Sequence, residues 1–547
     1  MNRVLWAAAV LGVSCGFRAE SVVESDGVTA GVEKVDEPGE DGGQADLVGE
    51  ALTVSCSVSA PVVAWVVSSG PIIAGNLIAK LDANGAAVGL GWFSGDHFSL
   101  GGVQPKSEAP THGISDLVVA HVDSEGNVAW LLVGGGASGD EFTSLDAEDS
   151  GAFVGGGSFG SGKIALAGKD LVSSHVGGGE ACDAGCADAF LLTGGVDGTV
   201  DWGPSIIADE AASVQAVRFG GGDKVFVAGS FWGEWAQVGA IELSAETGAC
   251  DGGFPAFLYD GFVARFNAHT WLVDWALTVG GPCSNGLVSL APAATGGIYV
   301  AGGFTGMGEG LSAGGLILEG TCDPYLGTGG CSNAFVLKLD DSGAAEEVWK
   351  QGFDTYPPLL DDFDDGSVVV AGGTRADHID VNGKTLVNHL ADDVYPYGDS
   401  YFPDDYVFLL NSQGEPIWMT STESGAPIDI SALAVDPFGG TWFAGQVVDG
   451  SAIDYPGCLP QHSSGSCQGA KLCCTYAVVH LAKEGDVLWS HVFPMPCGSS
   501  VSSLDIGSDG AVLMGGVSPK RGFGHFGDVE IGNEKEGVVW LMKFVVP

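Results

Sequence analysis

Positively charged residues are scarce in this chain of 547 residues. It has 20 Lys and Arg against 69 Asp and Glu, and its formal net charge at pH 7 is −49. Nucleic acids are bound by clustered cations that release counterions, so this balance excludes a nucleic-acid partner. It also argues against docking on an anionic lipid surface. The chain is not a disordered acidic tail, because 45% of its residues are hydrophobic and only 16% are charged.

Long hydrophobic runs are also missing. Beyond the N-terminus no stretch has the 18 or more apolar residues of a membrane helix, so we expect any membrane attachment to be through a lipid. Residues 1–15 contain Arg3, an apolar run and then Ser14-Cys15. They resemble a bacterial lipoprotein signal in which Cys15 is lipidated, although Gly12 stands where such signals usually have Leu. An ordinary cleaved secretory signal is the alternative, and both predict export to the periplasm, outer membrane or cell surface.

Residues 16–50 are rich in Gly, Glu and Asp and show no periodicity. Such a segment buries too little apolar surface to offset the entropy of ordering it. It is predicted to be a disordered tether that separates a folded domain, residues 51–547, from the membrane.

The folded part is dominated by an internal repeat. Seven tryptophans recur at intervals of 65 to 74 residues and end similar phrases, such as AFVLKLDDSGAAEEVW. A second phrase, such as SLAPAATGGIYVAGGFTG, lies between them. Each repeat thus has four short runs rich in Val, Phe, Ile and Trp, separated by Gly and Asp, which predict four antiparallel strands, a to d. The tryptophans are Trp65, Trp130, Trp202, Trp275, Trp349, Trp418 and Trp489.

Seven units of four antiparallel strands predict an all-β fold, a seven-bladed β-propeller. A solenoid is the alternative, but it would need distinct polar caps at its ends, and the sequence shows none. The chain begins with a lone strand d at residues 62–67 and ends with a lone strand c at residues 538–544. We therefore expect the N-terminal strand to complete the last blade and close a monomeric ring.

The repeats, which read roughly as vyvaGsf–G and then DaFvaklD–G–vW, resemble bacterial seven-bladed propeller repeat proteins of the SBBP and kelch-like kind. The resemblance covers nearly all of residues 52–547 and implies an exported or surface propeller. The strand c to d phrase is also similar to the docking motif of quinone-dependent dehydrogenases and outer-membrane assembly lipoproteins. Those rings usually have eight blades of shorter units.

Twelve cysteines follow Cys15, an even number suited to an oxidising compartment. Nearly all lie in the long b–c or the d–a connections, which share one face of a propeller. Three pairs lie within single b–c connections: Cys182 with Cys186, Cys322 with Cys331, and Cys458 with Cys467. We expect further bridges between Cys250 and Cys283, between Cys497 and either Cys473 or Cys474, and between Cys56 and the remaining cysteine. Zinc binding by Cys182 and Cys186 is the alternative to a bridge, but the sequence has no second Cys or His pair at zinc spacing.

The sequence shows no catalytic centre. Its acidic run Asp361, Asp362, Asp364 and Asp365 could bind calcium, with a solvated hairpin turn as the alternative. No other cofactor is expected. The candidate ligand loop is the b–c connection at residues 384–405, because aromatic faces beside carboxylates suit sugar rings or cations. An ordinary acidic loop is the alternative. The loop residues are His389, Asp392, Asp393, Tyr395, Tyr397, Asp399, Tyr401, Asp404 and Asp405.

These features predict an exported, lipid-anchored propeller that serves as a binding or scaffold module for protein or glycan partners at the cell envelope. The competing class is a propeller enzyme with its site in the central channel, either a quinone-dependent dehydrogenase or a glycan-cleaving enzyme. A ring of inward polar side chains on the strands a would favour the enzyme, as would a cationic cluster for the carboxylates of a quinone.

Overall fold

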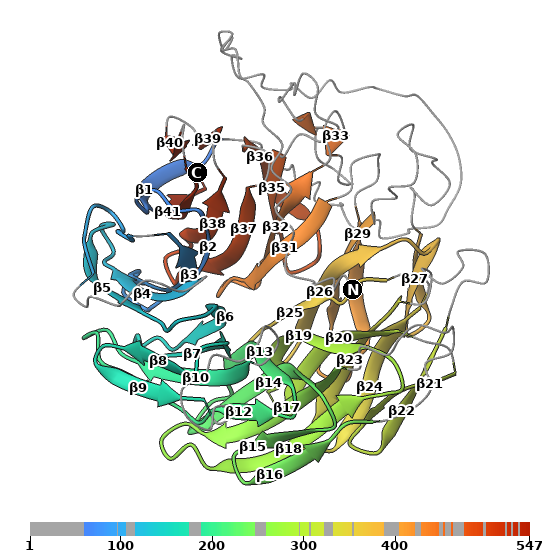
Figure 1. The fold of residues 1–547 in the computed structure, drawn as a ribbon. Coiled ribbons are helices and arrows are strands. Elements are labelled where there is room, and N and C mark those ends of the chain that lie inside the picture. Colours follow the sequence, from blue (N-terminus) through green and yellow to red (C-terminus); the bar gives the residue numbers. More distant parts are fainter. Residues whose placement is uncertain are drawn as a thin grey trace, which may run out of the picture.

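The structure is a computed structural model. It describes residues 60–95, 97–105, 115–173, 187–246, 259–294, 296–305, 308–321, 332–352, 355–387, 404–421, 428–447, 452–453, 461–462, 475–495, 499–519, 522–526, 529–533 and 536–546. All regular elements in these ranges are β-strands (Figure 1). No helix among them is long and apolar enough to cross a membrane. The all-β prediction is confirmed for this part of the chain.

Seven sheets in the described residues contain four or more strands, all paired antiparallel. Sheet one comprises β2 (Ala74–Leu81), β3 (Ala87–Ser94), β4 (Asp116–Val122) and β5 (Val128–Gly134). Sheet two comprises β6 (Asp140–Ala147), β7 (Phe153–Phe159), β10 (Asp188–Gly194) and β11 (Val200–Trp202), and β12 (Ile206–Ala208) also pairs with β10. Sheet three comprises β13 (Ala211–Phe219), β14 (Lys224–Trp232), β17 (Tyr259–Asn267) and β18 (Val273–Gly280).

The remaining sheets repeat this order. Sheet four comprises β19 (Asn285–Pro292), β20 (Ile298–Thr305), β23 (Ser332–Leu339) and β24 (Ala345–Gln351). Sheet five comprises β25 (Leu359–Asp362), β26 (Val368–Thr374), β29 (Asp404–Leu410) and β30 (Pro416–Thr420). Sheet six comprises β31 (Ile428–Val435), β32 (Thr441–Val447), β35 (Thr475–Leu481) and β36 (Val487–Pro494). Sheet seven comprises β37 (Ser500–Ile506), β38 (Val512–Ser518), β41 (Val538–Val545) and β1 (Val62–Ser68).

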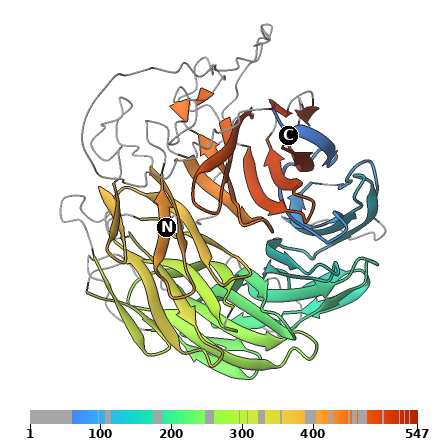
Figure 2. The ribbon, with the colours of Figure 1, turned by 180° about the vertical axis from the view of Figure 1, so that it is seen from behind.

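The predicted strand order is confirmed in every sheet, and each repeated tryptophan lies on a fourth strand. The N-terminal strand β1 pairs antiparallel with β41, with Val62 opposite Val545. Figures 1 and 2 show the sheets side by side around a common centre, with their first strands toward the middle. The first strand of each sheet contacts that of the next, and β37 contacts β2 in the same way.

The long b–c connections are more ordered than expected from their irregular sequences. Six of them contain a β-hairpin in their described parts. Two hairpins extend the preceding sheet, because β15 pairs with β12 and β21 pairs with β18. The hairpins are β8 (Lys163–Leu166) with β9 (Lys169–Val172), β15 (Trp235–Val238) with β16 (Ile241–Ser244), β21 (Gly308–Ala313) with β22 (Leu316–Gly320), β27 (His378–Val381) with β28 (Lys384–Val387), β33 (Ala452–Ile453) with β34 (Gln461–His462), and β39 (Gly522–Phe526) with β40 (Val529–Asn533).

The spacing of Gly and Trp in the repeat has a structural reason at the junctions between sheets. Trp418 of sheet five donates from Nε1 to the Lys483 carbonyl in the c–d turn of sheet six, at 2.7 Å. The same indole lies against Gly485, where φ is +92° and a Cβ would approach Trp418 to 2.7 Å. Glycine is required there by both the backbone angle and the close contact. Equivalent pairs are Trp65 with Gly126, Trp130 with Gly198 and Trp275 with Gly343.

The Ser-Leu-Asp phrase of the first strands links neighbouring sheets at their inner edges. In sheet two, Ser144 Oγ accepts a hydrogen bond from the backbone N–H of Val217 at 2.9 Å, and Asp146 Oδ2 accepts one from Phe219 at 2.8 Å. In sheet seven, Asp505 Oδ2 accepts from the N–H of Leu81 in sheet one, at 2.6 Å. These bonds satisfy N–H groups that face no other strand, and each contributes on the order of 1 kcal/mol.

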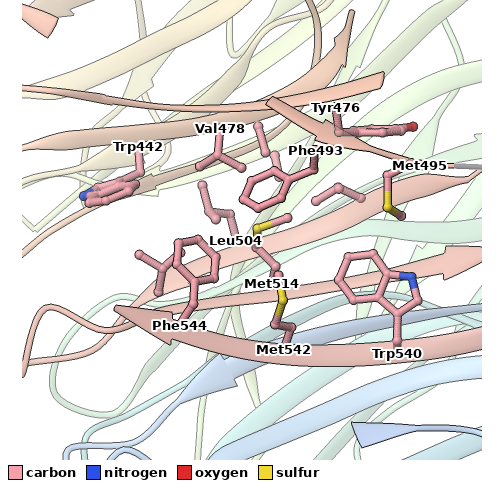
Figure 3. Close-up of a cluster of buried hydrophobic side chains, with 14 of the residues drawn as sticks. Trp442, Tyr476, Val478, Phe493, Met495, Leu504, Met514, Trp540, Met542 and Phe544 are labelled. Atoms are coloured by element: carbon pink, nitrogen blue, oxygen red, sulfur yellow. The ribbon is translucent and has the colours of Figure 1, made fainter. Parts of the chain in front are cut away.

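The hydrophobic core is divided into seven clusters, each between two successive sheets of the described residues. Figure 3 shows the cluster between sheets six and seven, where Trp442 and Phe493 face Met514, Met542 and Phe544. One of these seven clusters joins sheet seven to sheet one. The apolar faces of all seven sheets are therefore covered by a neighbouring sheet.

Candidate functional site

Five charged side chains occupy equivalent positions on the first strands of their sheets. In sheets two, three and seven the position lies three residues beyond a β-bulge, which in sheet two is at Thr143. The hydrogen bonds between sheets align these positions. Asp146, Asp361 and Asp505 each accept a backbone N–H of the next sheet, and Lys80 and Arg218 each come directly before a residue that donates such an N–H. Sheets four and six have alanines there, Ala291 and Ala434. We call the five residues together with Asp362 the inner charged ring. Its members are Lys80, Asp146, Arg218, Asp361, Asp362 and Asp505, all half-buried.

The ring brings together five of the seven sheets. Lys80 Nζ of sheet one lies 3.0 Å from Asp505 Oδ1 of sheet seven, and the two side chains are 20% and 15% exposed. Burial by itself lowers the pKa of Lys80, but the carboxylates of Asp505, Asp361 and Asp146 outweigh it and raise the pKa above its ordinary value. Lys80 therefore carries its charge at neutral pH, held by an excess of carboxylates.

Asp362 stands where sheets one, three and six have the apolar residues Leu81, Phe219 and Val435. Burial, followed by repulsion from its neighbour Asp361, raises the pKa of Asp362 to about 8. Its carboxyl group is thus mostly protonated at neutral pH. Asp361 has a hydrogen bond to the next sheet, because its Oδ2 accepts one from the backbone N–H of Val435 at 2.8 Å.

At neutral pH the ring thus combines two cations, three carboxylates and one neutral acid. Lys80 is already paired, and Arg218 donates from Nη1 to the carbonyl of Val217 at 3.0 Å. The negative charge is in excess, so the ring favours an incoming cation. When such a cation approaches, the proton on Asp362 can leave, which would add a fourth carboxylate to the site.

A second location is a cavity of about 330 Å³ between sheets six and seven. On its wall, His480 Nε2 lies 3.0 Å from Asp436 Oδ2 and its ring stacks on Trp442 at 4.0 Å between centroids. Burial opposes ionisation of Asp436, but hydrogen bonds from His480, the Gly440 N–H and Trp442 lower its pKa to about 2. The polar groups are mutually satisfied, so this wall is a packed junction rather than a reactive site. The cavity residues are Asp436, Phe438, Trp442, His480, Leu488, Trp489, Ile506, Gly510 and Val546.

The four acids that were considered as calcium ligands do not converge. Asp361 and Asp362 belong to the inner charged ring, whereas Asp364 and Asp365 are exposed in the β25–β26 turn. Asp365 Oδ1 accepts the N–H of Ser367 at 3.0 Å, and its Oδ2 lies 3.2 Å from Lys483 Nζ. No group of three or more acidic, His or Cys side chains in the described ranges is arranged to hold a metal ion. The solvated turn was the better interpretation for Asp364 and Asp365.

Most of the other predicted residues lie outside the described residues. Of the candidate ligand loop, Asp404 and Asp405 begin β29, and Asp405 is buried. His389, Asp392, Asp393, Tyr395, Tyr397, Asp399 and Tyr401 lie outside the described ranges, as do Cys15 and eleven of the twelve later cysteines. Cys283 is described, buried and disulfide-bonded, and its pairing with Cys250 stays a prediction.

Sequence reasoning did not identify Lys80, Arg218 or the ring role of Asp362. The available signal was the alignment of the first strands on the Ser-Leu-Asp phrase. That alignment places Lys80 and Arg218 at the Asp position, and Asp362 at the apolar position that follows.

No family model matches the chain, and no curated protein matches it. Among solved structures, it is similar to an acylaminoacyl peptidase of Pyrococcus horikoshii, at 6% identity over 81% of this chain and 49% of that one, with a TM-score of 0.40. It spans about half the length of that peptidase and of a related peptidase complex, of which it covers 52%. A member of the DUF4221 family from Bacteroides vulgatus is 9% identical over 90% of this chain and 98% of that one, with a TM-score of 0.30.

Proposed function

We propose that this protein is a closed seven-bladed β-propeller of the SBBP and kelch-like kind, with β1 completing the last blade. The seven sheets, the pairing of β1 with β41 and the core cluster between sheets seven and one support this architecture. The radial repetition of a propeller leaves only short, protected sheet edges, which suits an exported protein that must resist aggregation and proteolysis. Export with lipid attachment at Cys15 is part of the proposal and rests on the N-terminal sequence.

We further propose that the ring is a binding or scaffold module for a protein or glycan partner at the cell envelope, and that its inner charged ring receives a cationic group of that partner. The observation that carries this is that the six ionisable residues of the inner charged ring come from the first strands of five sheets. A lysine side chain or an amino sugar has the required chemistry. The net charge of −49 would attract such a partner from a distance.

A matched pair of glycans tests this proposal. Chitosan oligomers carry free amino groups, whereas chitin oligomers of equal length are N-acetylated and neutral. Isothermal titration of the full chain should show binding of chitosan oligomers but not of chitin oligomers, and Asp362→Asn should weaken it. Asp201→Asn, which removes a carboxylate that is 73% exposed, is the matched control. Equal binding of both glycans would refute a cation site. A protein that binds neither glycan and no lysine-rich peptide would refute it as well.

The enzyme alternative is favoured by two observations, the polar side chains of the inner charged ring on the first strands and the neutral Asp362 beside Asp361. A protonated acid next to a carboxylate is an arrangement that glycan-cleaving enzymes use. The quinone alternative is less favoured, because carboxylates already surround Lys80. Release of reducing sugar from a polysaccharide panel, lost in Asp362→Asn, would establish cleavage in place of simple binding.

A further inference from the structure

The cavity between sheets six and seven lies at the end of these sheets that carries their a–b turns. Phe438 and Gly510 come from those two turns, and Trp489, Ile506 and Val546 belong to the apolar part of the wall. The hydrogen-bonding side chains of the remaining wall satisfy one another. The cavity therefore offers an occupant mainly apolar contacts.

The position of this cavity follows from how sheet seven is built. At four other junctions the strand d tryptophan of one sheet lies against the c–d turn glycine of the next sheet and donates to a carbonyl of that turn. In sheet seven, strands c and d are β41 and β1, which are far apart in the sequence, so no c–d turn connects them. Trp489 is the strand d tryptophan of sheet six, and the cavity lies beside it, where this turn is missing.

Phe438, at the edge of the cavity, departs from the pattern of the other a–b turns. It is 72% exposed, more than any other large hydrophobic side chain among the described residues. It directly precedes Gly439, a turn glycine with positive φ, and in four other sheets the residue before the corresponding glycine is polar. These polar residues are Asn84, Ser150, Asp365 and Asp509. An exposed aromatic side chain beside an apolar cavity indicates a contact surface.

The chain that leads into β1 reaches its sheet beside this cavity. Val62 pairs with Val545, and Val546 lines the cavity, so the residues before Val62 leave the sheet at the edge of the cavity. Pro61 is buried and has no N–H to donate to a strand ladder, so the chain is free to change direction there. Residues 51–59, which come just before and lie outside the described ranges, are the nearest chain available to fill the cavity.

Residues 51–59 have the sequence ALTVSCSVS, which differs from the acidic segment before them. They carry no charge, and from Leu52 onward apolar residues alternate with Thr and Ser. This alternation is typical of an extended segment with one apolar face. Nine extended residues reach up to about 30 Å, which is ample for a cavity that begins at Val546.

We propose that residues 51–59 turn back at Pro61 and fill the cavity between sheets six and seven, in place of the missing c–d turn. Their apolar face, with Leu52, Val54 and Val58, packs against the apolar wall and covers Phe438. Burial of these side chains stabilises the docked segment, and no charged group has to be desolvated. The contact attaches the N-terminal segment to the last two sheets and reinforces the pairing of β1 with β41.

Photo-crosslinking of the full chain tests this contact. The crosslinking amino acid p-benzoylphenylalanine replaces Phe438, and the crosslinked peptides of the monomer are identified by mass spectrometry. Leu272, which is 68% exposed in the c–d turn of sheet three, receives the same group as a matched control. We expect crosslinks to residues 51–59 of the same chain from position 438 and not from position 272. If position 438 gives no such crosslink, the proposal is overturned, and crosslinks to a second copy would instead indicate a contact between copies.

Thermal melting gives an independent measurement. The double variant Leu52→Ser with Val54→Ser loses apolar contacts, so its Tm should lie about 2–4 °C below that of wild type. Its crosslinking from position 438 should fall several-fold. The control Val22→Ser with Val23→Ser removes two apolar side chains from the acidic segment and should change neither quantity. Equal Tm values for wild type and the Leu52 and Val54 variant would contradict the docking of this segment.

Disulfide mapping adds an outcome that would also overturn the proposal. Cys473 and Cys474 come directly before β35, a strand of seven residues, and His480 near the other end of that strand lines the cavity. A strand of this length spans about 20 Å. A bridge from Cys56 to either cysteine, one of the pairings left open by the sequence, would hold the segment at the wrong end of sheet six.

Discussion

Replacing Asp362 with Asn should change the pH dependence of stability in a defined direction. The pKa of Asp362 is about 8 in the folded protein, and its ordinary value is 3.8. Between these two values the folded state holds a proton that the unfolded state releases, so wild-type stability falls as the pH rises through this window. Asn cannot ionise and closely matches the protonated acid in shape. The variant should therefore escape the loss.

The two pKa values differ by about four pH units. At roughly 1.4 kcal/mol per unit, the loss in wild type between about pH 4 and pH 8 is at most about 6 kcal/mol. Because Asp362 is half-buried, water and small movements will reduce this upper limit, and a measured difference of about 2–4 kcal/mol is expected. Above pH 8 both states are ionised and the difference becomes constant.

Urea denaturation of wild type and Asp362→Asn at several pH values provides the measurement. The difference between their unfolding free energies isolates this residue, because the other titrating groups are common to both proteins. It should be smallest near pH 4, should favour the variant increasingly up to about pH 8, and should stay constant from there to pH 9. Asp201→Asn, which changes an exposed acid, should show no such trend. A difference that is independent of pH would refute the placement of Asp362 in a buried, negatively charged ring.

Two further predictions concern the junctions between sheets. Gly485→Ala should destabilise the protein by about 1–3 kcal/mol more than Gly168→Ala, as measured by urea titration. Both glycines have positive φ, but only Gly485 lies against an indole. Equal losses of stability would show that the contact with the indole does not matter. Asp505→Ala should cost about 3–5 kcal/mol, because it leaves Lys80 half-buried without its partner. The double variant with Lys80→Met should recover part of that loss, and no recovery would contradict a direct pair.

Much of the fold could be read from the sequence, because the repeat places turn residues and tryptophans at fixed positions. The hairpins inside the b–c connections were missed, although one carried a clear local signal. Asn382-Gly383 has φ values of +46° and +87° and joins β27 to β28, as expected for a two-residue hairpin turn. Other hairpins use turns such as Ala167-Gly168, which sequence alone does not distinguish from loop. Their pairing with the preceding sheet depends on contacts far apart in the chain.

The inner charged ring was harder to predict, because its members are separated by most of the chain length. Lys80 and Asp505 are 425 residues apart and meet only because sheet seven lies beside sheet one. A β-bulge also precedes the ring position in several first strands, as at Thr143 in sheet two, and shifts the side chains that follow it. Strand alternation counted from the sequence therefore assigns some of these residues to the wrong face.

The proposed cation site lies where the side chains of the first strands differ from one repeat to the next. On the first strands, an Asp that accepts a backbone N–H occupies this position in three sheets, and Lys80 and Arg218 occupy it in two others. A repeat that satisfies every polar group has nothing left for a ligand. The positions that break the pattern at a cost in stability are therefore where binding should be sought.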